Sequence, residues 1–294
     1  MGMMEWLRCK MGLSEIETYL RGDSDCIVRR LLSHSEDIGS TFYHWYLARA
    51  YEAATDYAAK NNCVVATLAD VIQLLTHAPW ESEIHRHAYT STTEENIGKT
   101  AGGVAVMITG HGPVLALSAS AMRMHTAYKQ KGFLDELTIT KAEVQAALQG
   151  KTPSGRSVQV YESFNEFCDA AESNRLPHEY IVITEFETEK KYAEKYYGSL
   201  TDFKELQEDQ RLIIRSGGPS AAQRFAHRLQ GYTSVCNVTS LAAFGDPDKP
   251  KGCLVGIKQR AYGISYDDMV TYSEEMDGSG WGHFVVMKSD VIKK

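Results

Sequence analysis

The sequence has no apolar run that approaches the roughly 18 to 20 residues needed to span a bilayer as a helix. Its first residues, MGMMEWLRCKMGLSE, carry charges where a signal peptide needs an uninterrupted apolar segment. We therefore expect a soluble, intracellular protein with no membrane partner.

Paired cysteines are also lacking. The cysteines are widely scattered, without the Cys-x-x-Cys spacing of a zinc site or the density of a disulfide scaffold. We expect them to be reduced and mostly buried as small hydrophobes. They stand at positions 9, 26, 63, 168, 236 and 253.

A surplus of positive charge is absent, because the sequence has 31 Lys and Arg but 38 Asp and Glu, which gives a net charge of -7. Holding nucleic acid tightly needs a basic face that neutralises phosphates, so we do not expect such a partner. The densest acidic cluster, at 265–277, is expected to be a solvated face. The apolar fraction of 43% and charged fraction of 23% are typical of a globular protein with ample core.

The first 150 residues are expected to be mainly helical. Residues 41–61 contain no Gly or Pro, and their apolar positions recur at helical spacing. A second helix is predicted at 66–77, where Pro79 ends it, and a shorter one at 26–34. Two apolar runs around Gly-His-Gly-Pro predict a β-hairpin near 104–120.

A domain boundary is predicted at 151–157. It follows a helix at 140–150, which begins with a Thr-x-x-Glu capping box and ends with Gly. Strands then alternate with helices, so 157–294 is expected to be an α/β domain. Its strands are predicted at 157–161, 211–215, 232–238, 252–257 and 283–287, and 176–184 is predicted to be a turn followed by a buried strand. The expected fold class is α+β or α/β, with a helical N-terminal part followed by a mixed sheet flanked by helices.

One functional interpretation takes Ser216, Gly217, Gly218 and Ser220 as a phosphate-binding loop between a strand and a helix. Glycines let the backbone approach an anion, and the helix start directs N–H groups at it. The pattern is not Gly-x-Gly-x-x-Gly, and Pro219 removes one N–H donor. The alternatives are a nucleotide- or small-molecule-binding enzyme, or a tight turn without chemistry.

A second interpretation takes Cys236 as a nucleophile. With Gln230, His283 and Asp290, it resembles the arrangement of papain-like and bacteriocin-leader-type cysteine peptidases. The resemblance implies that Gln230 supplies an oxyanion donor, His283 activates the thiol and Asp290 orients the histidine. A thiol buried in a strand would instead be inert and structural.

Histidines 77, 85 and 87 form the one metal-like cluster of the sequence. No Asp, Glu or Cys follows at a spacing that completes a zinc site, so solvent-facing or hydrogen-bonded histidines are favoured. We expect no metal and no cofactor.

Six short segments of 157–294 follow one another in a recognisable order: Leu176-Pro177, Tyr180 to Ile183, Gly231-Tyr232, Leu254 to Gly256, Ala261-Tyr262 and Phe284 to Ile292. This order resembles the C-terminal half of tailed-phage major capsid proteins. The resemblance implies a subunit that assembles with its own copies into a virion shell, without catalytic residues or a tight grip on DNA. The sequence therefore favours a structural, homo-oligomeric protein over an enzyme, with the two enzymatic interpretations as alternatives.

Overall fold

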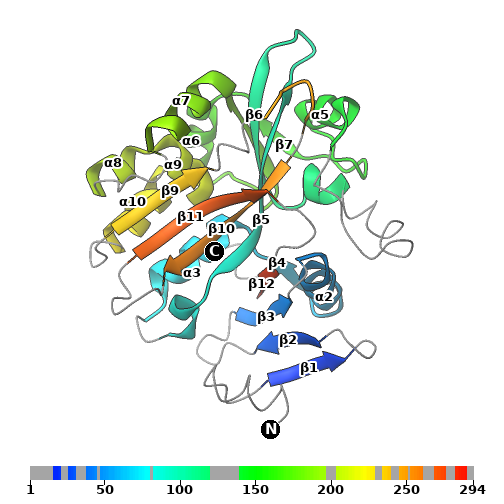
Figure 1. The fold of residues 1–294 in the computed structure, drawn as a ribbon, viewed down its shortest axis with the longest axis vertical. Helices are drawn as coiled ribbons and strands as arrows, with labels where there is room; N and C mark the ends of the chain where they lie inside the picture. The colour runs from blue at the N-terminus through cyan, green and yellow to red at the C-terminus, as the bar shows by residue number, and fades with distance from the viewer. Residues whose placement is uncertain are drawn as a thin grey trace.

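Twelve strands form one mixed sheet within the part of the chain that the structure describes (Figure 1). The structure is a computed structural model and describes residues 16–20, 26–30, 38–44, 47–79, 82–119, 139–196, 203–228, 234–239, 245–250, 252–260, 268–275 and 282–289. The strands are β1 (Ile16–Leu20), β2 (Cys26–Arg30), β3 (Ile38–His44), β4 (Cys63–Val65), β5 (Tyr89–Lys99), β6 (Ala105–His111), β7 (Gln159–Tyr161), β8 (Tyr180–Glu185), β9 (Ser234–Thr239), β10 (Gly252–Arg260), β11 (Asp268–Glu275) and β12 (Gly282–Lys288).

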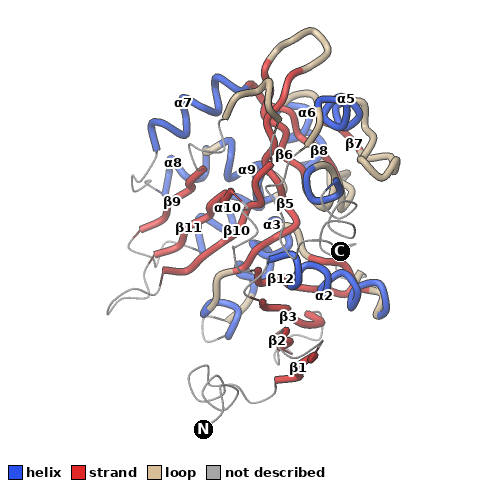
Figure 2. Tube along the Cα trace, turned by 45° about the vertical axis from the view of Figure 1, so that its right-hand side comes forward, coloured by secondary structure: helices blue, strands red, loops and turns tan. Residues whose placement is uncertain are grey.

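Helices lie on both faces of this sheet (Figure 2). In the described part of the chain, none of them is long and apolar enough to cross a membrane. The helices are α2 (Leu47–Lys60), α3 (Leu68–His77), α5 (Lys141–Leu148), α6 (Phe164–Glu172), α7 (Phe186–Tyr196), α8 (Phe203–Glu208), α9 (Gln210–Ser216) and α10 (Pro219–Arg228), with a 3-10 turn, η1 (Glu83–Arg86), before β5.

The two halves of the sequence share this sheet. The main strand order is β1-β2-β3-β12-β5-β10-β11-β9, and β6 connects β5 to β8 and β7. The final strand, β12, pairs with β3 and β4 from the first half of the chain. Strands from 1–150 and from 157–294 thus alternate, and the segment 151–157 does not separate two sheets. The predicted α+β class with a mixed, helix-flanked sheet is confirmed, although the first 150 residues contribute β1 to β6 as well as helices.

The central strands separate two hydrophobic cores. In β12, Val285 and Met287 belong to one core, whereas Phe284 and Val286 belong to the other. This alternation follows from the two-residue period of a strand. The first core is covered by α3, α6, α8, α9 and α10, and the second by α2 and α5.

Local signals place several helices correctly. Thr67 and Asp70 form a capping box that begins α3, and the chain leaves the helix at Ala78, before Pro79. Thr140 and Glu143 form the predicted capping box of α5. Pro219 is the first residue of α10, as predicted from its position after two glycines.

The prediction of a strand at 211–215 is wrong, because these residues lie in α9. Asp209 caps the helix by accepting from the N–H groups of Arg211 and Leu212, and Gly217 ends it in the left-handed conformation. All residues from Arg211 to Ser216 are buried. A helix buried on every side shows no amphipathic period, so its apolar run looks like that of a buried strand.

Three other local predictions also need correction. The segment predicted as a helix at 26–34 contains β2, and the helix predicted at 41–61 begins only at α2, after β3. The second run of the expected hairpin near 104–120 is helical at 116–119. The acidic segment 265–277 contains β11, which pairs with both β10 and β9, and its expected solvent exposure stays a prediction. Pairing with neighbouring strands overrides local helix propensity in β2 and in the part of β3 that lies within 41–61.

Two buried carboxylates of β5 hold neighbouring elements. Glu95 accepts from the guanidinium of Arg215 at 2.9 and 3.0 Å, which ties α9 to the sheet. Glu94 accepts from the backbone N–H groups of Val114 and Leu117 at 3.0 and 2.9 Å, and from that of Leu115. Burial raises the pKa of Glu94 to about 7, although these N–H groups act in the opposite direction.

Candidate functional site

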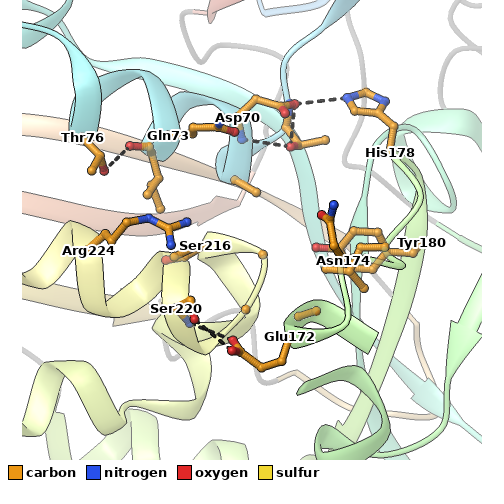
Figure 3. Close-up of a pocket in the computed structure, with 18 of the residues that line it drawn as sticks. Asp70, Gln73, Thr76, Glu172, Asn174, His178, Tyr180, Ser216, Ser220 and Arg224 are labelled. Atoms are coloured by element: carbon orange, nitrogen blue, oxygen red, sulfur yellow. Dashed lines mark hydrogen bonds and ion pairs between the residues drawn. The ribbon is translucent and has the colours of Figure 1, made fainter. Parts of the chain in front are cut away.

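A polar cavity of about 300 Å³ lies on the face of the sheet covered by α3, α6, α9 and α10. Its walls come from α3, the end of α6, the residues leading into β8, and the α9–α10 turn (Figure 3). Three parts of the chain that are distant in the sequence, namely α3, the connection from α6 to β8 and the α9–α10 turn, therefore converge on one small space.

Asp70 anchors the α3 wall. Its Oδ2 accepts from the N–H and hydroxyl of Thr67, both at 2.7 Å, and from Nε2 of His178 at 3.1 Å. Burial acts to raise the pKa of Asp70, but the hydrogen bond and charge of His178 outweigh it and leave this pKa below its usual value. Burial acts to lower the pKa of His178, and Asp70 outweighs it and raises this pKa. The two groups thus form a mutually stabilised ion pair.

Tyr180, the first residue of β8, reaches the floor of the cavity. Its ring stacks on His111, with centroids 4.4 Å apart and planes at 15°, and packs against Phe167. The residue is 3% exposed, and its hydroxyl has no hydrogen-bond partner among the described residues. Burial raises the pKa of Tyr180 well above its usual value, so the hydroxyl keeps its proton and can donate.

His111 positions this tyrosine and the next wall together. Its Nε2 donates to the carbonyl oxygen of Ile214 in α9 at 2.9 Å. Burial lowers the pKa of His111 to about 4, so the ring is neutral at physiological pH. A neutral ring beneath Tyr180 links the sheet to α9 without adding charge to the cavity.

The α9–α10 turn forms the opposite wall. Ser216 is 3% exposed, and its hydroxyl, like that of Tyr180, lacks a partner within the described part of the chain. Gly217 and Gly218 follow with φ values of 82° and 131°, a region that favours glycine. A Cβ on Gly218 would lie 2.6 Å from the Cβ of Ala171, so this glycine allows α10 to pack closely on α6.

The turn does not provide the expected phosphate cradle. The N–H groups of Gly217 and Gly218 donate to carbonyls of α9 at 3.1 and 2.9 Å, and Pro219 has none. The N–H and hydroxyl of Ser220 donate to the carboxylate of Glu172 at 3.1 and 2.9 Å. The loop also follows a helix instead of a strand. The N–H groups of Gly217, Gly218 and Ser220 are therefore engaged within the protein, with a carboxylate where the phosphate was expected.

Arg224 and two amides complete the lining. The Arg224 guanidinium extends from α10 into the cavity (Figure 3) and makes no ion pair with any described residue. Asn174 follows α6 in the left-handed conformation, with φ of 52°, and Gln73 lies on α3. Their side-chain amides make no hydrogen bond within the described ranges, so each can donate and accept toward a bound molecule.

The structure does not bring Cys236 and His283 together. They lie on β9 and β12, which β5, β10 and β11 separate, and four strand spacings amount to about 19 Å. Nδ1 of His283 donates to the carbonyl oxygen of Ala88 at 3.0 Å. Gln230 and Asp290 lie outside the described residues. The peptidase interpretation therefore lacks the thiol–imidazole contact that it requires.

The three histidines of the metal-like cluster lie apart from one another. His77 lines the cavity, Nε2 of His85 lies 3.3 Å from the carbonyl oxygen of Ala78, and the ring of His87 contacts Tyr89 and His283 edge-on. Among the described residues, no three His, Cys, Asp or Glu side chains are grouped so that they could hold a metal ion.

The sequence interpretation identified Ser216 but missed its neighbours Asp70, His178, Tyr180 and Arg224. A weak signal was present: His178 and Tyr180 are two residues apart at the start of a predicted strand, so they share a face. Asp70 was hidden because a capping-box carboxylate is ordinarily structural. The ion pair of Asp70 and His178 joins positions 108 residues apart, which no local pattern records.

Comparisons with known proteins identify a fold but no family. No protein-family model and no curated protein matches the chain. A solved structure, described as the C-type lectin fold accommodating massive sequence variation in Nanoarchaeota, superposes with a TM-score of 0.54 and 15% identity, covering 87% of this chain and 99% of its own. None of this bears on the resemblance to capsid proteins, which stays a prediction that light scattering of the purified protein would test. At such low identity the likeness establishes a shared fold, and the chain is therefore similar in fold to a C-type lectin fold protein.

Proposed function

We propose that this protein is a recognition protein that binds a small polar molecule in the cavity between α3, β8 and the α9–α10 turn. The observation that carries the proposal is the pair of buried hydroxyls, on Tyr180 and Ser216, that line this cavity without a partner among the described residues. A buried polar group without a hydrogen bond costs about 1–3 kcal/mol. These two hydroxyls therefore favour a state in which a bound molecule satisfies them.

The size and lining of the cavity support binding. Pockets for small molecules span roughly 300 to 1,000 Å³, and this one, at about 300 Å³, suits a molecule at the small end. Its wall is held in place by the contacts of Tyr180 with His111 and Phe167 and by the ion pair of Asp70. Preorganised groups lose little entropy when a ligand binds.

The fold also supports recognition. The nanoarchaeal neighbour is described as a fold that accommodates massive sequence variation. A backbone that persists while its side chains change can present different binding groups on one scaffold. Since fold alone does not establish function, this point adds to the cavity and does not replace it.

Binding is favoured over catalysis because the buried serine of the cavity, Ser216, has no base beside it among the described residues. The buried hydroxyl of this serine makes no hydrogen bond to His178, the imidazole of the ion pair. A general base must lie within hydrogen-bond reach of the proton that it removes. The Asp70–His178 pair therefore serves as a charged part of the wall.

A Tyr180→Phe variant tests the proposal. Because it deletes a buried hydroxyl without a partner, we expect the free energy of unfolding without ligand to stay unchanged or to rise, by up to about 1–3 kcal/mol. Binding should weaken. Urea unfolding measures the first effect, and thermal shifts with a library of small polar metabolites measure the second.

The matched control is Tyr161→Phe, since Tyr161 packs edge-on against Tyr180 but is not part of the cavity lining. It should keep every thermal shift of the unaltered protein. A clear loss of stability in ligand-free Tyr180→Phe would show that the Tyr180 hydroxyl stabilises the fold, which would contradict its role in binding. A library without a single hit would also count against the proposal.

A further inference from the structure

The acidic groups of the cavity are already engaged by the protein. Both carboxylate oxygens of Glu172 accept from Ser220, one from its N–H and one from its hydroxyl. Oδ2 of Asp70 accepts from Thr67 and His178. These carboxylates are satisfied without a ligand, so they do not call for a cationic molecule.

The arginine of the cavity, Arg224, is not engaged in this way. Arg224 has no carboxylate partner within the described residues, and its guanidinium points into the cavity on the same side as Ser216 (Figure 3). A guanidinium presents its N–H groups as a rigid fork that matches a carboxylate in two parallel hydrogen bonds. Arg224, which is exposed to solvent, can therefore donate to an anionic group that enters the cavity.

The neutral groups around Arg224 complement a hydroxylated molecule. The hydroxyls of Tyr180 and Ser216 are buried donors without partners in the described chain. The amides of Asn174 and Gln73 offer one acceptor oxygen and two donor hydrogens each. Such a mixture can satisfy hydroxyl groups, which donate and accept at once.

A doubly charged phosphate fits poorly. Glu172 accepts from the N–H group of Ser220 at the start of α10, where a phosphate would otherwise bind, and its negative charge lies against that position. A second negative charge close by would be repelled. A singly charged group at Arg224, one helical turn from Ser220, would be repelled less by this carboxylate than a doubly charged phosphate.

We infer that the ligand is a small hydroxycarboxylate, with its carboxylate on Arg224 and its hydroxyl groups on Tyr180, Ser216 and the two amides. This inference rests on the proposed binding function and specifies its ligand class. Arg224 is the specificity residue that selects an acid over the corresponding neutral molecule.

Pairs of probes that differ only in charge test the inference. Isothermal titration compares L-lactate with L-lactamide and D-gluconate with D-gluconamide, and includes inorganic phosphate. The unaltered protein should bind at least one acid about tenfold or more tightly than its amide, since a charge-assisted hydrogen bond is worth roughly 1.5–3 kcal/mol. Phosphate should bind more weakly than that acid.

Arg224→Gln should remove this preference by lowering the affinity for the acid about tenfold while leaving the amide unchanged. The matched control is Arg175→Gln, an exposed arginine of the neighbouring segment that does not line the cavity. It should bind as the unaltered protein does.

The outcomes separate the inference from the function on which it rests. Equal binding of acid and amide, or an Arg224→Gln variant that keeps the preference, overturns the ligand class but leaves a binding site that Tyr180→Phe still weakens. Tighter binding of phosphate than of either acid also overturns it. If neither acid binds while the metabolite library yields hits sensitive to Tyr180→Phe, the ligand class is wrong and the binding function stands.

Discussion

Glu94 makes the stability of this protein depend on pH in a predictable direction. Its side chain is fully buried, and its pKa is raised from 4.5 to about 7. Between these two values the folded protein holds a proton that the unfolded chain has released. Protonation therefore stabilises the folded state, and this stability is present at low pH and lost as the pH rises through about 7.

The size of the effect follows from the two pKa values. Each pKa unit of difference is worth about 1.4 kcal/mol. This carboxyl should therefore make the free energy of unfolding about 2.5 kcal/mol higher at pH 5 than at about pH 8. Urea unfolding at both pH values measures the summed contributions of all titrating groups to the free energy of unfolding, and these groups include His111, His178 and Asp70. The comparison with Glu94→Gln isolates the one group.

In the unaltered protein, Glu94 should raise the free energy of unfolding by about 2.5 kcal/mol between pH 8 and pH 5, and the glutamine variant should lack this increase. At about pH 8 it should also lose roughly 1–3 kcal/mol, because an amide NH₂ then faces one of the N–H groups of Val114, Leu115 and Leu117. The same pH dependence in both proteins would refute the assignment of this proton to Glu94.

Two further predictions concern the framework of the cavity. Arg215→Met should lower the free energy of unfolding by roughly 3–5 kcal/mol, because Glu95 keeps a buried charge without its partner, and adding Glu95→Gln should restore part of the loss; a loss below about 1 kcal/mol would contradict the role of this pair. Gly218→Ala should cost about 2–4 kcal/mol through its positive φ and its contact with Ala171, whereas Gly103→Ala, with positive φ but open space, should cost only about 1–2 kcal/mol. Equal losses in the two glycine variants would show that the contact with Ala171 is not tight.

Much of the local structure could be predicted because its causes are local. The capping boxes at Thr67 and Thr140 and the helix start at Pro219 depend on residues within one helical turn. The apolar runs of β10 and β12 are also visible in the sequence, since buried strands of a covered sheet are apolar on both faces.

Other elements could not be predicted because burial alone does not identify a partner. The run 211–215 packs as a helix among other helices, and 26–30 becomes a strand by pairing with β1 and β3. Both runs are apolar enough for either state, so their neighbours decided between them.

By itself the sequence determined an α+β composition, the capped helices, a scarcity of basic charge and the presence of a glycine turn at 216–220. The tertiary structure alone decided that this turn joins two helices, that its N–H groups are already used, and that Tyr180, His178 and Arg224 face the same cavity. The physical reason is that periodicity and capping depend on neighbours along the chain. A binding site depends on side chains that meet only after distant strands have paired and distant helices have packed.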